Sequence, residues 1–145
     1  MKGWLLDTDV LSATSPGKRP LPPATSAWFR ERTEALYLST VTAAEIEAGI
    51  ARLRRLGSAT RADNLREWFD RIVDAYAERI LPFDIAAARI AGALGDAALA
   101  AGRHPGFADV AIAAISQSRG LVVATMNRRH FEPLGVAVTN PFVPH

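Results

Sequence analysis

The 145-residue sequence contains no cysteine, which excludes disulfide bonds and thiolate metal sites and permits a reducing compartment. It also has no run approaching the ~20 apolar residues that a transmembrane helix needs. The first apolar stretch is interrupted by Asp7 and Asp9, too early for a signal peptide. We therefore expect one globular domain over residues 1–145 that does not contact a membrane.

Lysine is scarce: Lys2 and Lys18 are the only two, and the remaining basic side chains are arginines or histidines. Arginines cluster at residues 52–55 and again, followed by a histidine, at residues 128–130. Such clusters suit contact with a nucleic-acid backbone or an acidic partner, because the guanidinium group binds phosphate and carboxylate in two places. Charge alone favours the simpler interpretation of solvated helix faces.

The hydrophobic pattern alternates between short apolar runs and amphipathic segments, which predicts an α/β fold. We expect three α/β/α layers around a central, mainly parallel sheet of four to five strands. The strands are expected near residues 3–6, 35–41, 79–83, 121–125 and 136–139, and helices near 24–33, 42–56, 58–80, 85–101 and 107–119. A proline-rich loop, "SPGKRPLPP", and short helical turns near residues 10 and 128–131 complete this pattern.

Polar side chains follow the predicted strands. Asp7 ends the first strand, Glu45 lies in the first turn of the helix after the second, and Thr125 and Asn127 follow the fourth. Asp109 begins the helix that feeds the fourth strand, so it returns to the same edge of the sheet. Three carboxylates and an amide at one rim suit a hard divalent cation, Mg²⁺ or Mn²⁺.

Each residue also has a purely structural explanation. Glu45 completes a capping box with Thr42, Asp109 favours a helix dipole, and Asn127 is an ordinary N-cap. Asp9 caps the turn that begins at Val10 and orients Asp7. These explanations account for Glu45, Asp9 and Asn127 taken singly, but less well for Asp7 and Asp109, which lie within apolar sequence.

The sequence resembles the PIN-domain family, specifically the VapC-type toxins of type II toxin–antitoxin pairs, close to the FitB-like branch. The matching segments occur in family order across nearly the whole chain: "LLDTDVLS", "LYLSTVTAAEIEAGI", "RILPFD", "FADVAIAAIS", "VVATMNRRHFEPLGV" and "NPF". Each segment is weak evidence, whereas the ordered set is specific. The resemblance implies a cytoplasmic, dimeric, Mg²⁺- or Mn²⁺-dependent endoribonuclease that is held by a cognate antitoxin protein.

By position, the resemblance makes Asp7 and Asp109 the principal metal-binding acids and Glu45 the third acid of the active site. Asn127 falls where many relatives carry a fourth acid, so a site with one resting metal ion is expected. Thr125 matches a small hydroxyl residue beside the site, and Asp9 is a supporting residue. Asp7 and Asp109 would hold the ion while Glu45 holds a second ion or positions the attacking water.

The resemblance further suggests RNA products with 5′-phosphate and 3′-hydroxyl ends. Arg128 and Arg129 are expected to bind the RNA backbone. An arginine of the antitoxin would substitute for the metal at the acidic site. A groove between the helix from Thr42 and its neighbour would receive a segment of this partner.

Two other functions remain open at this stage. "LLDTDVL" also fits a haloacid-dehalogenase-like phosphatase, with Asp7 as nucleophile and Asp9 as general acid. That fold needs a later lysine, which is absent here, and would place Gly95 and Asp96 at a strand end where the pattern predicts a helix. The other alternative is a regulatory module that binds the antitoxin with little or no catalysis.

Overall fold

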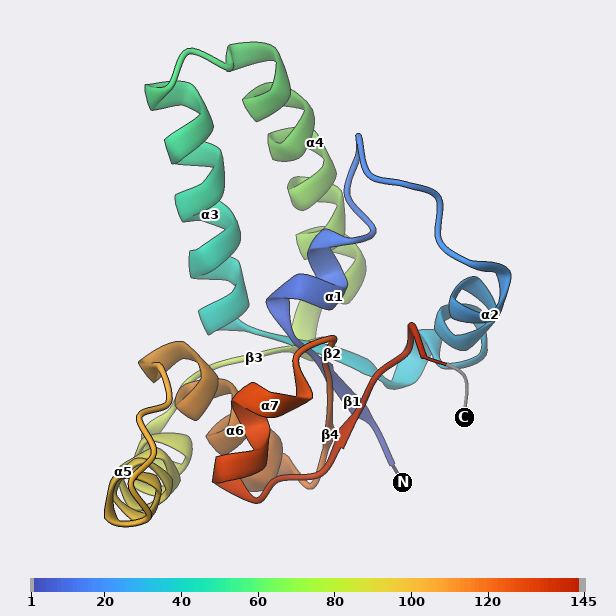
Figure 1. The fold of residues 1–145 in the computed structure, drawn as a ribbon. Helices are drawn as coiled ribbons and strands as arrows, with labels where there is room; N and C mark the ends of the chain where they lie inside the picture. The colour runs from blue at the N-terminus through green and yellow to red at the C-terminus, as the bar shows by residue number, and fades with distance from the viewer. Residues whose placement is uncertain (1, 144–145) are drawn as a thin grey trace.

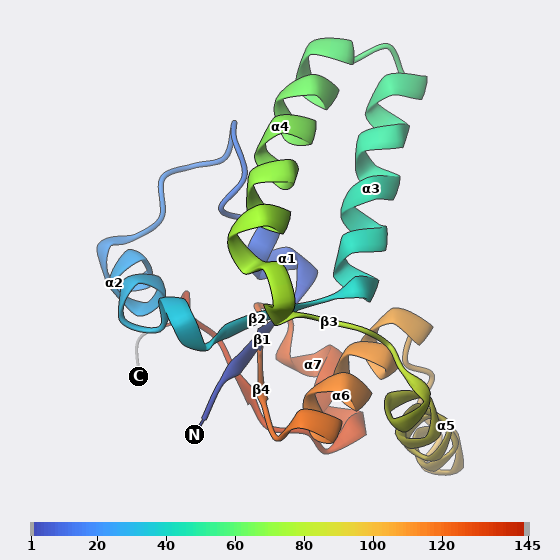
Figure 2. The same cartoon turned by 180° about the vertical axis from the view of Figure 1, so that it is seen from behind.

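The computed structural model describes residues 2–143, which form a parallel five-stranded sheet with helices on both faces (Figures 1 and 2). The strands are β1 (Trp4–Leu6), β2 (Leu36–Ser39), β3 (Ile80–Leu81), β4 (Val122–Ala124) and β5 (Val138–Thr139). Their order is β3-β2-β1-β4-β5, and every neighbouring pair is parallel. The predicted three-layer α/β/α fold is confirmed.

Helices account for most of the remaining chain. They are α1 (Thr8–Ser12), α2 (Pro23–Glu31), α3 (Thr40–Arg55), α4 (Ala59–Tyr76), α5 (Ile85–Ala100), α6 (Phe107–Arg119) and α7 (Arg128–Phe131), with short 3₁₀ turns at Thr33–Ala35, Ala77–Arg79 and Glu132–Leu134. No helix within residues 2–143 is long and apolar enough to cross a membrane.

The two faces of the sheet carry separate hydrophobic clusters, because successive strand side chains point to opposite faces. Leu5 packs with α5, α6 and α7, whereas Leu6 packs with α1, α2, α3 and α4. Both leucines are fully buried. The α3–α4 hairpin projects away from the sheet, while α5 and α6 lie on the other side (Figure 1).

Helix boundaries follow local capping chemistry. Asp84 is the N-cap of α5 and accepts a hydrogen bond from the Ala87 amide at 2.9 Å. Gly120 ends α6 in the left-handed conformation, with φ of 65°. Because α6 then feeds directly into β4, the start of α6 returns to the edge where the strands end.

Strand β1 is the point at which the strand order reverses. The chain moves from β1 to β2 and β3 on one side, and later to β4 and β5 on the other. Sites in parallel α/β sheets form beyond the carboxyl ends of strands at such a point. Asp7, which directly follows β1, therefore occupies the position where this fold places a functional group.

Candidate metal centre and its surroundings

Asp7 is the most buried carboxylate of the rim, with 7% of its surface exposed. Its Oδ1 accepts a hydrogen bond from the Thr8 amide and its Oδ2 accepts one from the Thr125 hydroxyl, both at 2.8 Å. The pKa of Asp7 is raised from 3.8 to about 6, chiefly by burial, then by the charge of Asp9 and to a smaller extent by that of Asp109. The two hydrogen bonds lower it and only partly offset these effects.

Asp9 and Asn127 form a hydrogen bond across the rim. Asn127 donates its side-chain Nδ2 to Oδ2 of Asp9 at 2.7 Å, and the Met126 amide reaches Oδ1 at 3.5 Å. Burial raises the pKa of Asp9, while these donors lower it. The backbone amide of Asn127 also donates a hydrogen bond to Thr125 Oγ1 at 3.0 Å. The loop after β4 therefore positions both Asp7 and Asp9.

Glu45 is positioned by a chain of hydroxyl groups. Thr8 donates its hydroxyl proton to Glu45 Oε1 at 2.5 Å, so the 2.9 Å contact between the Thr8 and Thr42 hydroxyls is donated by Thr42. Ser39 in turn donates its hydroxyl to Thr42 at 3.3 Å. Ser39 and Thr42 are fully buried, and the chain therefore connects the end of β2 to a carboxylate on α3.

Asp109 lies in the first turn of α6, with 25% of its side chain exposed, and Nδ1 of His130 approaches its Oδ2 at 3.5 Å. Burial raises the pKa of Asp109, the charges of Glu45 and Asp9 raise it further, and His130 lowers it. Hydrogen bonds through Thr8 connect Asp7 to Glu45, and hydrogen bonds through Thr125 and Asn127 connect Asp7 to Asp9. Asp109 lies near enough to raise the pKa of Asp7, and we call these four carboxylates the acidic cluster.

Several local expectations need correction. Asp7, not Asp9, is the N-cap of α1, because the helix begins at Thr8. Likewise α3 begins at Thr40 with Ser39 as its N-cap, so Glu45 lies in the second turn and the capping box between Thr42 and Glu45 does not form. Asn127 is the N-cap residue of α7, but its side chain makes no capping bond and binds Asp9 instead.

The two predicted RNA-binding arginines, Arg128 and Arg129, are exposed on α7. Together with Met126, Asn127, His130 and Asn140 they line a polar hollow beside the acidic cluster. A second hollow contains Arg103, Arg129, His130 and Asp109. The positions of these arginines are compatible with the predicted role.

Sequence reasoning paired Thr42 with Glu45 only as a capping box and missed Thr8, whose hydroxyl contacts both residues. Thr8 and Thr42 are 34 residues apart, and no local pattern indicates their contact. Their common feature is that each lies beside a predicted strand end, which is the signal that would have found them. Gly95 and Asp96 lie inside α5, so the arrangement that the phosphatase alternative requires is absent from this part of the structure.

The model of the family described as "PIN domain" matches residues 4–135. This chain belongs to the PIN-domain family. Within the family it is similar to the plasmid stability protein StbB of Pseudomonas syringae pv. tomato, at 39% identity over 95% of this chain and 97% of the relative. It is also similar to the VapC ribonuclease Y4jK of Sinorhizobium fredii, at 36% identity over 97% and 98% of the two chains.

The toxin FitB of Neisseria gonorrhoeae is 35% identical over 95% of this PIN-domain chain and 97% of its own. The crystal structure of FitAcB from the same organism superposes with a TM-score of 0.83, covering 97% of this chain and 99% of the matched chain. The predicted membership among VapC-type and FitB-like proteins is therefore confirmed.

Proposed function

We propose that this PIN-domain protein is a metal-dependent endoribonuclease that acts as the toxin of a toxin–antitoxin pair in the cytoplasm. The observation that carries the proposal is the acidic cluster, in which separate elements bring four carboxylates together at the carboxyl end of β1. Folding that gathers like charges is unfavourable unless a cation is bound there. The names of the VapC-type and FitB relatives support the choice of ribonuclease and toxin.

The donor set fits Mg²⁺ or Mn²⁺, which prefer oxygen ligands. Within residues 2–143, no three Asp, Glu or His side chains already lie in metal-binding geometry. Glu45, Asp9 and Asp109 each contact a neighbour instead: Thr8, Asn127 and His130. Mg²⁺ retains several waters and needs only one or two carboxylates, so Asp7 and Asp109 would hold it in this proposal.

The bound ion would lower the pKa of a coordinated water and neutralise charge on the scissile phosphate. The protein supplies the positioning. Thr125 and the Thr8 amide hold the carboxylate of Asp7 in one orientation, and Asn127 holds Asp9. Glu45, aligned by Thr8, accepts a proton from the attacking water or helps to place it. Hydrolysis would leave 5′-phosphate and 3′-hydroxyl ends.

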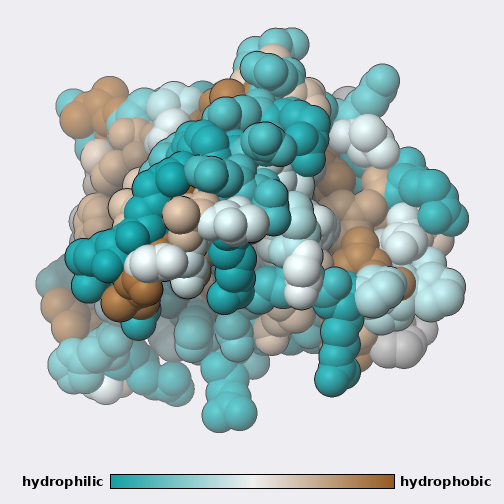
Figure 3. All heavy atoms as spheres, turned by 90° about the horizontal axis from the view of Figure 1, so that it is seen from above, coloured by the Kyte–Doolittle hydropathy of each residue, from teal (hydrophilic) through white to brown (hydrophobic). Residues whose placement is uncertain are grey.

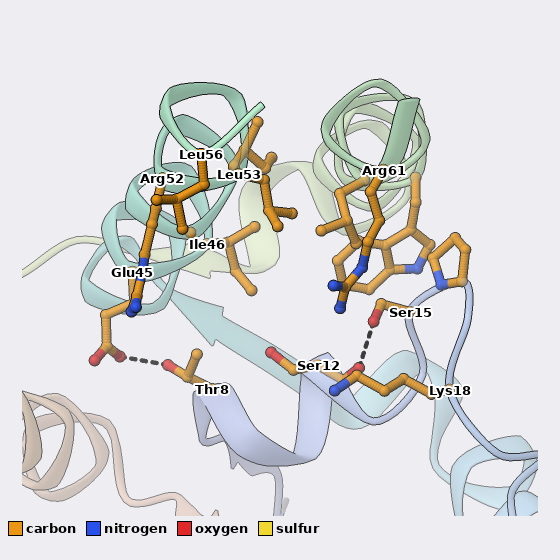
Figure 4. Close-up of a pocket in the computed structure, with 15 residues that line it drawn as sticks. Thr8, Ser12, Ser15, Lys18, Glu45, Ile46, Arg52, Leu53, Leu56 and Arg61 are labelled. Carbon is orange, nitrogen blue, oxygen red and sulfur yellow. Dashed lines mark hydrogen bonds between the residues drawn. The ribbon is translucent and has the colours of Figure 1, made fainter. Parts of the chain in front are cut away.

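A groove between α3 and α4 supports the proposal that the protein binds an antitoxin (Figure 4). It has a volume of about 460 Å³ and an apolar floor that includes Ile46, Leu53 and Leu56, while cationic side chains project into it. These cations are Lys18, Arg52 and Arg61. An amphipathic partner segment with apolar and acidic side chains would complement this surface, which we call the α3–α4 groove.

Glu45 belongs to both the α3–α4 groove and the acidic cluster. A partner segment lying in the groove therefore ends beside the carboxylates, where one of its arginines would replace the metal ion as the neutralising charge. Seen from the α3–α4 side, the molecular surface is mostly hydrophilic, and apolar patches show between polar side chains (Figure 3).

The test is cleavage of a mixed pool of structured RNAs by antitoxin-free protein in Mg²⁺, in Mn²⁺ and in EDTA. Asp7→Asn and Asp109→Asn should abolish metal-dependent cleavage, whereas Asp96→Asn, an exposed acid on α5, should leave it unchanged. Cleavage that persists in both site variants would refute the assignment of the site.

If folded protein binds Mn²⁺ and a cognate antitoxin but cleaves no RNA, the nuclease proposal fails and a non-catalytic antitoxin-binding module is the better description. The α3–α4 groove is the observation that favours this second function. The homodimer expected from the family resemblance is tested by light scattering, which should give twice the 15.6 kDa of one chain.

A further inference from the structure

A second cavity borders the acidic cluster at Asp9, and it shares Ser12 and Lys18 with the α3–α4 groove. It has a volume of about 570 Å³, within the range of about 300–1,000 Å³ typical of small-ligand sites. Its apolar wall includes Leu21, Met126 and Phe142, and two cations, Lys18 and Arg19, lie on its lining. Since half of its lining residues come from the proline-rich loop, we call it the proline-loop pocket.

The proline-loop pocket is continuous with the candidate metal centre. Asp9 lines it, and Oδ2 of the same Asp9 accepts the hydrogen bond from Asn127. Met126 lines both this pocket and the polar hollow that contains Arg128 and Arg129. If the backbone of a polymer crosses the acidic cluster, one of its monomers can therefore reach the proline-loop pocket.

The pocket is also held in shape. Residues 16–23 contain four prolines, which restrict the backbone of the loop. On the opposite wall, the Phe142 amide donates to Oδ1 of Asn140 at 2.9 Å, and the buried Thr25 hydroxyl donates to the Pro141 carbonyl at 3.0 Å. A wall fixed in this way loses little conformational entropy when a ligand binds.

We propose that the proline-loop pocket binds one nucleotide of single-stranded RNA, with its base against Phe142 and Met126 and its phosphate on Lys18 and Arg19. This inference deepens the proposed function, on which it rests. Aromatic rings that stack on bases, beside cations that bind the backbone, are the usual elements of single-strand recognition. The combination favours a nucleotide over a purely apolar ligand, and the adjoining α3–α4 groove, which shares Ser12 and Lys18 with this pocket, already suits a protein segment.

The first test measures binding of a fluorescent single-stranded oligoribonucleotide in EDTA, where no cleavage takes place. Phe142→Leu keeps apolar volume but removes the ring, and should weaken binding at least about fivefold. Phe107→Ala removes an exposed ring on α6, outside this pocket, and should leave the affinity unchanged. Phe142 also packs against the hydrophobic cluster that contains Leu6 and Trp28, so its replacement can affect the fold. Thermal unfolding of each variant therefore shows whether the fold is retained.

The salt dependence of binding tests the cations. Arg19→Gln should reduce the slope of log affinity against log salt concentration by about one, as expected for the loss of one phosphate contact. Arg89→Gln changes an exposed arginine on α5 and should leave the slope unaltered. Equal affinity and equal slope for Phe142→Leu, Arg19→Gln and the parent would overturn the inference.

A matched experiment removes the base instead of the ring. In a series of oligoribonucleotides, one abasic nucleotide is placed at each position in turn. The parent protein should bind one member of the series more weakly than the others, and Phe142→Leu should bind all members equally. If no register differs, the pocket does not bind a base. If the pocket variants change only the affinity for the antitoxin, the occupant is the protein partner and the inference is wrong.

The outcomes for the two proposals are distinguishable. Metal-dependent cleavage with unaltered RNA binding in the pocket variants would refute the pocket and leave the nuclease intact. Binding in EDTA that depends on Phe142 and Arg19, without cleavage in any metal, would support the pocket and refute the nuclease. Absence of RNA binding by the parent would refute the pocket directly.

Discussion

The hydroxyl of Thr125 donates a hydrogen bond of 2.8 Å to Oδ2 of Asp7, although the two residues are 118 positions apart in the chain. They follow β4 and β1, which lie next to each other in the sheet. Thr125 is fully buried, and its hydrogen bond favours the ionised form of Asp7. It thus keeps a buried carboxyl group closer to the charge state that metal binding requires.

Replacing Thr125 with Val should raise the pKa of Asp7 further, because the residue keeps its shape but loses the donor. Carbon-detected NMR of the Asp7 carboxyl group would measure the change. Thr125→Ser retains a hydroxyl and should restore the parent value. The unfolding free energy at neutral pH should fall by about 1 kcal/mol in Thr125→Val. An unchanged Asp7 titration would show that the hydrogen bond has no electrostatic effect.

The stability of the metal-free protein should depend on the ionisation of Asp7. Since its folded-state pKa of about 6 lies above the ordinary 3.8, the folded state binds the proton more tightly than the unfolded state. The resulting stabilisation is complete below pH 3.8 and is lost as pH rises through about 6. The difference between the two pKa values of Asp7 corresponds to at most about 3 kcal/mol of unfolding free energy.

Asn cannot ionise, so Asp7→Asn removes the cost of burying a charged carboxylate at high pH. The unfolding free energy of the variant relative to the parent should therefore be higher at about pH 7.5 than at about pH 4. Denaturant unfolding in EDTA at the two pH values measures the effect. Mn²⁺ should stabilise the parent at the higher pH and should have little effect on Asp7→Asn. A pH-independent difference between the two proteins would contradict the raised pKa.

Asn127→Asp should convert the 2.7 Å hydrogen bond with Asp9 into repulsion between two carboxylates. We expect a lower melting temperature without metal and tighter or additional Mn²⁺ binding, because the site gains a negative oxygen ligand. Calorimetric titration with Mn²⁺ reports both affinity and stoichiometry. Asn64→Asp, at an exposed position of α4, adds the same charge elsewhere and serves as the control.

Leu56→Asp should weaken binding of the cognate antitoxin by at least about tenfold, because it places a charge in the apolar part of the α3–α4 groove. Leu56 is 60% exposed, so the fold should tolerate the change. Val73→Asp introduces the same side chain at an exposed position outside the groove. Calorimetry with purified antitoxin should separate the two variants, and equal affinities would place the partner elsewhere.

Much of the candidate site follows from the sequence because the carboxyl ends of parallel strands share one edge. That rule predicts the gathering of Asp7, Asp109 and Asn127 once strands and helices are assigned. Asp109 is the clearest case: its helix must run back against β4, which returns the first turn of α6 to the rim. The electrostatic influence of Asp109 on the pKa of Asp7 agrees with this placement.

Features that depend on side-chain orientation were beyond sequence reasoning. Asp7 and Asp9 are both good N-caps, and only the start of α1 at Thr8 decides between them. The capping box proposed for Glu45 failed because Ser39, three residues before Thr42, begins the helix earlier. The proline-loop pocket joins residues 18–22 to Phe142, and no local pattern links segments so far apart.

The position of β1 in the middle of the sheet has a consequence for synthesis of the protein. Asp7 is made 118 residues before Thr125, and before both of the strands on the Thr125 side of the sheet. The hydrogen bonds that hold Asp7 and Asp9 from the loop after β4 therefore form only once β4 and that loop have been synthesised.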